Sequence, residues 1–584
     1  MKSVRFALAA LTALAYSSAV FAQQLPSPAF NNLTVNGNLN LPSKSANNFF
    51  AAPDGSSGAP TFRPLVVGDM PADMSAIGIT SLSQAKTAAQ WITYVGGNGI
   101  IPGCVGNGIA DDTTCLTAAM TARPFGTLQL GNGIYRITSG ITIPAGLTVL
   151  GNGGGGGQYD FTCDVGIRVA AAGINAITMS AGSKLLNTCI DYATTPTSNA
   201  AVFAGASANS VVISDVQINK AFIGIDITGS GGTQNVDGVI RHNVITPRNV
   251  SGAMGIRVGN ASTGASTVDT QILGNTVYCY DGGLSDAIGM KFLDSGGSLV
   301  TANAVYGCGV GTQIYPGANQ AAIWNYFTGT VVGDTSKTND LYINTFAASA
   351  QVRGNQFAGS WTSSAAAEAV YIDNSASGVV YGNHFVGHRA YISTNQTGFR
   401  VRGGAKFSLD SSTVCAGATS TGTAVLIEAS ASDSAVRGNS IGVCDNVGGG
   451  TLTNGISITQ SSSNLVGVVA NNSIIGTTNA FVYTPTGGNA TSAIIHDNLG
   501  VDNAGGAVTG GTTITLPVTK FVVVNGPATV TTINGGWSSR EVTLSNNGTI
   551  TYNTGGNICN ALSGASGTLT TAIYDGSSAC WRLK

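Results

Sequence analysis

The chain has 584 residues, only 9% of them charged, and its formal net charge is −2. A near-neutral chain without a basic stripe is not expected to bind nucleic acid. A hydrophobic content of 43% excludes wholesale disorder, and 81 glycines favour a large folded chain with many turns.

Residues 1–22 are predicted to be a secretory signal peptide. Lys2 and Arg5 precede an apolar run from 6 to 20, and small residues occupy the cleavage positions before Gln23. The apolar run is too short for a good membrane anchor, and we expect no membrane insertion elsewhere. We therefore expect a secreted, extracellular protein.

Residues 23–95 are predicted to form an extended N-terminal connector. Its first part, 23–75, is rich in Pro, Asn and Ser and lacks helical periodicity. Residues 51–71 resemble a connector found in bacteriophage tail fibres and tailspikes, and a flexible linker is the alternative interpretation. Only residues 83–95 are expected to form a short helix in this region.

The next segment combines one helix with several short strands. Asp111 or Asp112 is placed to cap the helix. The apolar face of this helix is expected to hold Cys115, Leu116, Ala119 and Met120. Alternating strand patterns follow at 126–130, 133–137 and 141–151.

This helix-and-strand segment resembles the first part of the pectate-lyase-like β-helix superfamily, which many phage tailspikes and depolymerases share. The resemblance extends from about residue 96 to about residue 500. It implies that a helix closes one end of a solenoid. The sequence departs from the family pattern at Asn107, where Asp is usual, and in lacking a Pro around Gly131. The resemblance implies fold more firmly than activity.

A short phrase recurs from Val211 to Asn498, roughly 20 to 34 residues apart, which indicates stacked repeats. In its clear copies an aliphatic residue lies three positions before an Asn, and an apolar residue two positions after it. These copies are centred on Asn275, Asn303, Asn355, Asn383 and Asn439, with looser copies at Asn243, Asn325, Asn344, Asn472 and Asn498.

A unit this small cannot bury its apolar side alone, so the copies must stack. If they stack in parallel, each Asn amide lies above the next one and can donate to one neighbour and accept from the other. β-Hairpin turns are the alternative, but they do not explain the apolar residues around each Asn. We predict an all-β fold, a single-stranded right-handed parallel β-helix over residues 96–504.

A second phrase, a small residue followed by a short strand, accompanies most copies. Its central residue is expected to point outward, one coil above the next. This outward column is Asp226, Arg257, Lys291, Gln313, Tyr342 and Tyr371.

The ten cysteines fall into five neighbouring pairs along the sequence. The predicted disulfides are Cys104–Cys115, Cys163–Cys189, Cys279–Cys308, Cys415–Cys444 and Cys559–Cys580. Cys279 and Cys308 are about one repeat apart, so stacking would bring them to bonding distance. Buried free thiols are the alternative, because sequence alone does not prove connectivity.

Residues 505–584 are predicted to form a small separate β module. Strand-like runs end near Trp581, and the module resembles the C-terminal modules of some phage appendage proteins. Such modules cap a solenoid or assist trimerisation, so Trp537 and Trp581 are expected in the core rather than in contact with a ligand.

Outward aromatic side chains on successive coils suit the stacking of sugar rings. The predicted substrate-binding residues are Trp324, Tyr326, Tyr342, Tyr371 and Tyr381. An equally open alternative places them between subunits of a trimer. Glu368 and Asp373 are the predicted catalytic carboxylates, with Arg353 and His384 as candidates for an eliminative reaction. We expect no metal and no cofactor, because neither zinc-ligand spacing nor the calcium cluster of pectate lyases is present.

Together with the resemblance to the β-helix superfamily, these observations predict a tailspike-like protein that binds bacterial surface or extracellular polysaccharide. It would act as a glycoside hydrolase or polysaccharide lyase and would assemble as a homotrimer. A virion tail is the alternative location. A non-catalytic adhesin or structural appendage protein is the alternative function.

Overall fold

The computed structural model describes residues 48–51, 61–64, 100–123, 125–153, 163–229, 235–260, 267–279, 286–293, 295–314, 323–328, 331–332, 338–344, 348–353, 356–357, 368–374, 382–392, 396–403, 406–416, 421–428, 434–442, 451–460, 467–485, 493–500 and 505–584, some of them by their backbone only. The predicted signal peptide and the helix at 83–95 lie outside these residues.

The chain divides into two compact units, Met1–Ile92 and Thr93–Lys584. In the first unit, β1 (Asn48–Ala51) and β2 (Thr61–Pro64) pair antiparallel. All that follows concerns the second unit.

Three long parallel sheets build most of the second unit. The first sheet contains β4 (Gly126–Gln129), β7 (Leu147–Leu150), β10 (Lys184–Leu186), β13 (Val212–Ser214), β17 (Val239–Arg241), β21 (Gln271–Leu273), β25 (Leu299–Thr301), β28 (Ile323–Thr328), β31 (Ala348–Arg353), β34 (Gly382–Val386), β37 (Lys406–Asp410), β40 (Ser434–Arg437), β43 (Gly467–Ala470) and β46 (Ala493–His496). The second sheet contains β3 (Asn107–Asp111), β5 (Ile134–Ile137), β8 (Gly166–Val169), β11 (Cys189–Tyr192), β14 (Gln217–Ala221), β18 (Val244–Pro247), β22 (Thr276–Tyr278), β26 (Ala304–Tyr306), β29 (Val331–Val332), β32 (Gln356–Phe357), β35 (Arg389–Ile392), β38 (Thr413–Ala416), β41 (Ser440–Gly442) and β44 (Ser473–Ile475). The third sheet contains β6 (Ile141–Ile143), β9 (Ile177–Met179), β12 (Ala200–Ala204), β15 (Ile223–Ile227), β19 (Met254–Val258), β23 (Ile288–Phe292), β27 (Val310–Ile314), β30 (Asn339–Asn344), β33 (Glu368–Asn374), β36 (Thr397–Gly403), β39 (Thr423–Ile427), β42 (Leu452–Gln460) and β45 (Thr477–Pro485).

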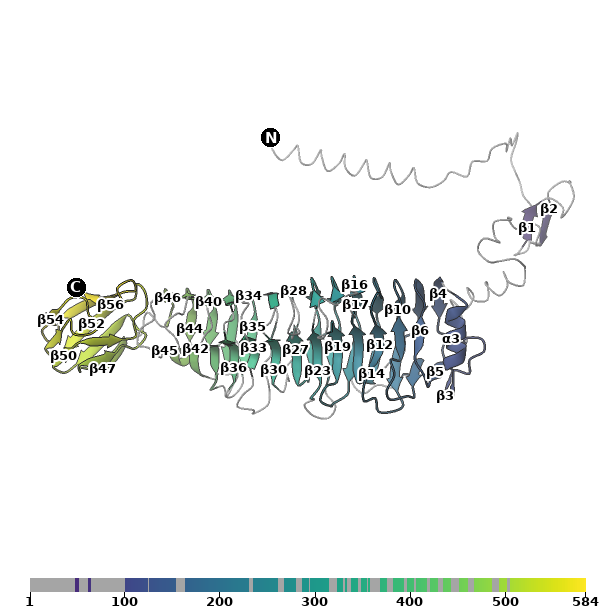
Figure 1. Cartoon of the computed structure of the whole chain (residues 1–584), viewed down its shortest axis with the longest axis horizontal. Coiled ribbons are helices and arrows are strands. Elements are labelled where there is room, and N and C mark those ends of the chain that lie inside the picture. The colour runs from purple at the N-terminus through teal and green to yellow at the C-terminus, as the bar shows by residue number, and fades with distance from the viewer. Residues whose placement is uncertain are drawn as a thin grey trace, which may run out of the picture. The chain divides into compact units, whose positions relative to one another are not determined.

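Each coil takes one strand from each sheet in turn, as β25, β26 and β27 do. Each strand pairs in parallel with its counterpart in the next coil. Figure 1 shows the strands stacked in sequence from α3 to β45. Parallel crossovers of this kind are right-handed. The predicted right-handed parallel β-helix is therefore confirmed. A short fourth sheet of β16 (Asn235–Val236), β20 (Thr267–Val268) and β24 (Ser295–Gly296) is added to three of the coils.

The interior of the solenoid consists of aliphatic columns that follow from strand alternation. In the coil that contains β25 to β27, Val300, Val305 and Ile314 are at most 1% exposed. Each lies one strand spacing, about 4.8 Å, from its counterparts in the coils above and below. The core is therefore continuous along the axis, although each coil is only about thirty residues long.

A ladder of buried asparagines follows the first sheet. Its described members are Asn243, Asn275, Asn303, Asn439, Asn472 and Asn498, none more than 2% exposed. Asn243 Nδ2 donates to Asn275 Oδ1 at 2.8 Å, and Asn275 Nδ2 donates to Asn303 Oδ1 at 2.9 Å. The same bonds join the last three members. The predicted ladder is confirmed for these residues.

The prediction that Asn383 belongs to the ladder is wrong. Phe385 pairs with Val352 below and Leu409 above, so the residue three positions after it, His388, occupies the ladder column. His388 is 2% exposed, and its backbone N–H donates to Ser412 Oγ at 3.1 Å. Asn383 instead lies within β34, opposite Phe407.

Two looser copies of the phrase also lie outside the ladder. Asn325 pairs with Ala350 inside the first sheet, and Asn344 pairs with Asp373 in the third sheet. The prediction that these two residues belong to the ladder is therefore wrong. Asn355 lies outside the described residues.

The residue before each ladder position has a positive φ. This column contains Asp215, His242, Gly274, Ala302, Gly387, Ser411, Gly438, Asn471 and Asp497, with φ between 49° and 69°. Left-handed backbone favours Gly and, to a lesser degree, Asn and Asp. The sharp turn between the first and second sheets therefore recurs at every described level.

Helix α3 (Thr113–Thr121) packs on β5 and β6 at the N-terminal end of the solenoid. Asp111 Oδ1 accepts the backbone N–H of Thr113 at 3.1 Å, whereas the Asp112 carboxylate binds two N–H groups of the preceding loop. Thr113, Leu116, Ala119 and Met120 form the buried face. The prediction that Cys115 belongs to this face is wrong, because Cys115 is half-exposed and bonded to Cys104.

Four of the five predicted disulfides are present, with Cα atoms 4.8 to 5.7 Å apart: Cys104–Cys115, Cys163–Cys189, Cys279–Cys308 and Cys559–Cys580. Cys415 is also disulfide-bonded. Its predicted partner, Cys444, lies outside the described residues. Cys279 and Cys308 follow paired strands of the second sheet, so their disulfide joins adjacent coils.

Separate sheets form after residue 504. The main sheet contains β47 (Gly505–Thr509), β49 (Phe521–Asn525), β52 (Glu541–Asn547), β55 (Leu569–Asp575) and β56 (Cys580–Leu583). The smaller sheets contain β48 (Thr513–Thr515) with β51 (Thr532–Asn534), and β50 (Ala528–Val530) with β53 (Ile550–Tyr552) and β54 (Leu562–Gly564). Trp537 and Trp581 are 5% and 0% exposed, so both are core residues as predicted.

Candidate functional site

The outward column of the third sheet carries a cluster of aromatic and charged side chains. The register stacks Asp226, Arg257, Lys291, Gln313, Tyr342 and Tyr371 level by level, as the sequence predicts. It then continues through Arg400 and Leu426. Strands β30, β33, β36 and β39 position the part of the column from Tyr342 upward, which we call the tyrosine–arginine site.

Tyr342 and Tyr371 form the aromatic part of this site. Their ring centroids are 5.4 Å apart and the ring planes are tilted by 32°. The Arg400 guanidinium lies 5.2 Å from the Tyr371 centroid, on the coil opposite to Tyr342. Both faces of the Tyr371 ring are therefore occupied by protein, which leaves its edge and hydroxyl for a ligand.

Arg400 joins two glutamates on neighbouring levels. Its Nη1 donates to Glu368 Oε1 at 2.6 Å, while Nε and Nη2 bind the Glu428 carboxylate at 3.1 and 2.9 Å. These hydrogen bonds raise the pKa of Arg400 despite its partial burial, which acts in the opposite direction. Arg400 is held in one position by this arrangement, and its charge is balanced within the site.

Glu368 is buried, with 6% exposed, and both of its carboxylate oxygens are bound. Asn339 Nδ2 donates to Glu368 Oε2 at 2.9 Å, and Arg400 occupies the other oxygen. The register pairs Glu368 with Asn339 and Val370 with Leu341, and it passes over the residue between them. The same position is passed over in the neighbouring coils of the third sheet, and β33 continues past Ile372 to Asn374.

Asp373 and Arg402 are the more exposed charged groups of the site. Asp373 follows Tyr371 by two positions, and Arg402 follows Arg400 by two positions. The register of the paired strands β33 and β36 places Asp373 opposite Arg402. Burial raises the pKa of the Tyr371 phenol, although the hydrogen bond from Arg402 opposes this rise. A hydroxyl, an exposed guanidinium and a carboxylate thus lie together at the surface, all able to hydrogen-bond sugar hydroxyls.

The lower part of the column is internally paired. Arg257 binds Asp226 with two hydrogen bonds, from Nε to Oδ1 at 2.8 Å and from Nη2 to Oδ2 at 2.6 Å. Asp226 is 2% exposed. Burial raises the pKa of Asp226, opposed by the bonds from Arg257. This pair stabilises the wall of the solenoid and offers little to a ligand.

The other predicted site residues belong to the first sheet. Trp324 and Tyr326 lie in β28, Arg353 in β31 and His384 in β34. His384 is exposed, and its Nδ1 lies 2.6 Å from Ser408 Oγ. Tyr381 lies outside the described residues. The predicted set is therefore divided between two sheets, and the structure brings together only Tyr342, Tyr371, Glu368 and Asp373.

The sequence reading missed three residues of the site: Arg400, Arg402 and Glu428. The first two belong to a further copy of the second phrase, in which Gly398 is the small residue. Extending the outward column by one more level would have identified Arg400. Glu428 follows β39 and carried no comparable signal in the sequence.

One acidic and cysteine-containing cluster lies outside this site. The ligand atoms of Cys104, Asp112 and Cys115 lie within 4.8 Å of one another. The two sulfurs are bonded to each other and the carboxylate accepts backbone N–H groups, so these atoms already have partners. Within the described parts of the chain, the helical structure is too short to span a bilayer.

Several solved structures share the solenoid architecture. Bacteriophage CBA120 tailspike protein 3 is 11% identical with a TM-score of 0.45, and the match covers 85% of this chain and 69% of that one. The Dettilon tailspike protein is 14% identical with a TM-score of 0.36, covering 61% of this chain and 66% of that one. The A-module of the Azotobacter vinelandii mannuronan C-5 epimerase is 13% identical with a TM-score of 0.35, covering 68% of this chain and 97% of that one.

This chain thus spans just under two thirds of the Dettilon tailspike. Neither a protein-family model nor a curated protein sequence matches this chain.

Proposed function

We propose that this protein binds a bacterial surface or extracellular polysaccharide at the tyrosine–arginine site and cleaves it as a glycoside hydrolase or polysaccharide lyase. The observation that carries the proposal is the stack of Tyr342, Tyr371 and Arg400 on three adjacent coils, bordered by carboxylates. Aromatic rings with a few convergent polar groups are typical of carbohydrate-binding surfaces.

The glycan would contact edges and hydroxyls more than ring faces. Tyr371 is covered on both faces, so a sugar would meet its edge and hydroxyl rather than its ring face. Arg402 is exposed and hydrogen-bonds the Tyr371 hydroxyl, so it can donate to the same sugar. The site extends along the axis of the solenoid over adjacent coils, so an extended glycan would lie parallel to that axis.

Cleavage would require a carboxylate that a bound glycan can reach. Both Glu368 oxygens are engaged, so in this proposal Glu368 is a positioning residue that holds Arg400. Asp373 is the more exposed carboxylate, whereas both Glu428 oxygens are bound by Arg400. Elimination would use Asp373 as the base, and hydrolysis would use it as one of the two carboxylates that the reaction needs.

A non-catalytic adhesin or structural appendage protein is the second candidate. The observation that favours it is the complete pairing within the Glu368, Arg400 and Glu428 triad. Charged groups that are hydrogen-bonded to one another stabilise a surface without supplying a reactive group. Binding without turnover would select this candidate.

The experiment incubates the purified full chain with a panel of bacterial polysaccharides. Binding is measured by calorimetry, and cleavage by new reducing ends and by the ultraviolet absorbance of unsaturated products. Tyr342→Ala should weaken binding by about fivefold, the loss of about 1 kcal/mol expected for one aromatic contact. Asp373→Asn should keep binding and lower turnover by about a hundredfold.

Tyr306→Ala is the matched control. Tyr278 and Tyr306 form a similar pair on the second sheet, with centroids 6.5 Å apart. Equal loss of binding in the Tyr342 and Tyr306 variants would place the ligand elsewhere. Full turnover in the Asp373→Asn variant would remove Asp373 from the reaction.

The same proposal includes secretion and assembly as a homotrimer, with a virion tail as the alternative location. The predicted signal peptide and the observed disulfides support an oxidising destination. Light scattering of the mature protein tests the trimer, and the mass of a single mature chain would contradict it.

A further inference from the structure

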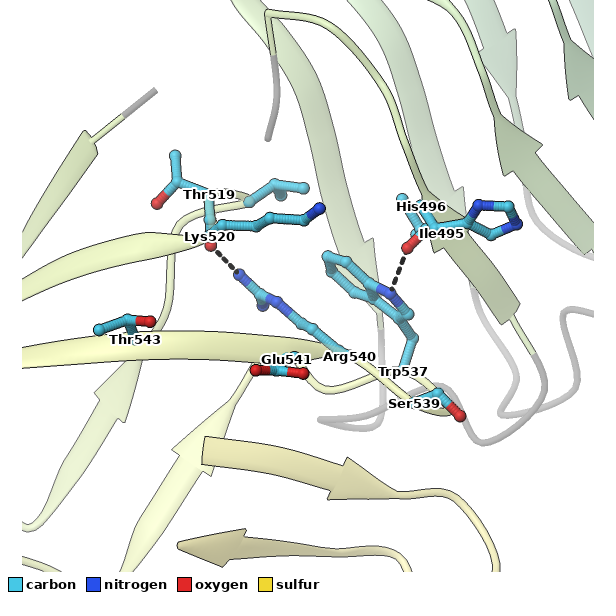
Figure 2. A pocket seen from close by; sticks show the side chains of 10 residues that line it. Ile495, His496, Thr519, Lys520, Trp537, Ser539, Arg540, Glu541 and Thr543 are labelled. Carbon is cyan, nitrogen blue, oxygen red and sulfur yellow. Dashed lines mark hydrogen bonds between the residues drawn. The ribbon is translucent and has the colours of Figure 1, made fainter. Parts of the chain in front are cut away.

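A pocket of about 380 Å³ lies where the C-terminal module meets the last coils of the solenoid. Figure 2 shows Ile495 and His496 from β46 on one side of it, and Lys520, Trp537 and Arg540 from the module on the other. Its volume falls in the range of small-molecule sites. It is separate from the tyrosine–arginine site, which lies on β30 to β39.

The junction holds Trp537 firmly in the wall of this pocket. Its Nε1 donates to the carbonyl oxygen of Ile495 at 3.1 Å, a bond drawn in Figure 2. Its ring centroid lies 6.4 Å from that of Phe481 and 6.2 Å from that of Tyr483, in the last strand of the third sheet. The pocket therefore has a rigid aromatic side that belongs to both parts of the unit.

Arg540 is a buried cation in the same wall. It is 3% exposed, and its guanidinium lies 4.2 Å from the Trp537 centroid. It donates to the carbonyl oxygens of Gly535 and Pro517, and to that of Thr519 at 3.4 Å. Among the described residues no carboxylate pairs with it. Burial lowers the pKa of Arg540 to about 9.

A buried charge without a countercharge is unfavourable. Carbonyl dipoles and the Trp537 ring stabilise the guanidinium in part, but they leave its positive charge uncancelled. Lys520 adds a second cation to the lining. Glu541 also lines the pocket, yet its side chain is exposed and forms no ion pair with Arg540.

We propose that this junction pocket binds one carboxylate-bearing monosaccharide unit. Its carboxylate would lie between Arg540 and Lys520, and its hydroxyls would meet the hydroxyl groups of Thr519 and Ser539. The carboxylate follows from the uncompensated Arg540. The saccharide character rests on the proposed function, because a polysaccharide ligand would present such units along its length.

The test titrates the full chain with methyl β-D-glucuronide and methyl β-D-glucoside by calorimetry. The glucuronide should bind at least about tenfold more tightly, the scale of one charge-assisted hydrogen bond. Lys520→Gln should weaken glucuronide binding by about tenfold, and Glu541→Gln should strengthen it, because a repelling carboxylate is removed. Lys184→Gln, at an exposed lysine of β10 on the first sheet, is the matched control and should change nothing.

Equal affinity for the two glycosides would overturn the inference, as would an unchanged affinity in the Lys520→Gln variant. Inorganic sulfate binding as tightly as the glucuronide would show an anion site without sugar recognition, which also overturns it. Tyr342→Ala separates this inference from the proposed function. If that variant alone loses glucuronide binding, the acidic sugar occupies the tyrosine–arginine site and the junction assignment is wrong.

Discussion

Replacing Asn275 by leucine should destabilise the solenoid by about 2–4 kcal/mol. Asn275 Oδ1 accepts two hydrogen bonds from Asn243, one from its backbone N–H and one from its amide. Its Nδ2 donates to Ile240 O and Asn303 Oδ1. Leucine is close in size but removes all four bonds. The buried N–H of Asn243 loses its acceptor, which costs about 1–3 kcal/mol, and the weakened neighbours add to this.

The assay is urea unfolding followed by circular dichroism, with the free energy of unfolding compared at equal slope. Asn479→Leu is the control, because Asn479 Nδ2 donates to Asn454 Oδ1 at 3.0 Å on the exposed surface. There water replaces the lost partner, so the change should stay within about 0.5 kcal/mol. If both variants lower the free energy of unfolding by the same amount, burial is not the reason that the ladder stabilises the solenoid.

Three further predictions concern the turns, the disulfides and the helix cap. Gly438→Ala should destabilise by about 1 kcal/mol and Ala302→Gly should stabilise by about 0.5 kcal/mol in the same urea assay, because both positions have positive φ. The double substitution Cys279→Ala and Cys308→Ala should lower the free energy of unfolding by about 2–4 kcal/mol under oxidising conditions, and the difference should vanish after reduction. Hydrogen bonds from two threonines lower the pKa of Asp111, so its contribution to stability is full above the ordinary aspartate pKa and is lost as the pH falls through the folded value. Asp111→Asn should therefore reduce the decrease in Tm between about pH 5 and about pH 3. If Tm falls by the same amount in the variant and in the original protein, this prediction is wrong.

The repeat itself could be predicted because apolar spacing and Asn occur together in most coils. Asn275, Asn303 and Asn439 were placed correctly, since each is preceded by Gly or Ala and framed by buried aliphatic residues. The coil of β34 offers two overlapping phrases. Asn383 fits one, and His388 fits the other with Gly387 before it. Strand pairing places His388, not Asn383, in the ladder column. The column therefore accepts His and Ser as well as Asn.

Only the part of the site that belongs to the outward column of the third sheet could be predicted from the sequence. The register of Tyr342 above Gln313 and below Tyr371 follows from strand alternation. The burial of Glu368 does not follow from strand alternation, because it depends on hydrogen bonds from Asn339 and from an Arg of the next coil. The separation of His384 from Tyr371 depends on which sheet each phrase belongs to, and a period alone does not assign sheets.

The closure of the solenoid at both ends has a consequence for association. A stack of parallel strands ends in rows of unpaired N–H and C=O groups, which can template pairing with another molecule. Helix α3 packs across the first coils, and Trp537 reaches the backbone of the last one. A chain shortened before residue 505 would present β44, β45 and β46 as three open edges. We expect such a fragment to associate end to end into fibres. Residues 505–584 would prevent this association in the intact chain by covering the last coil.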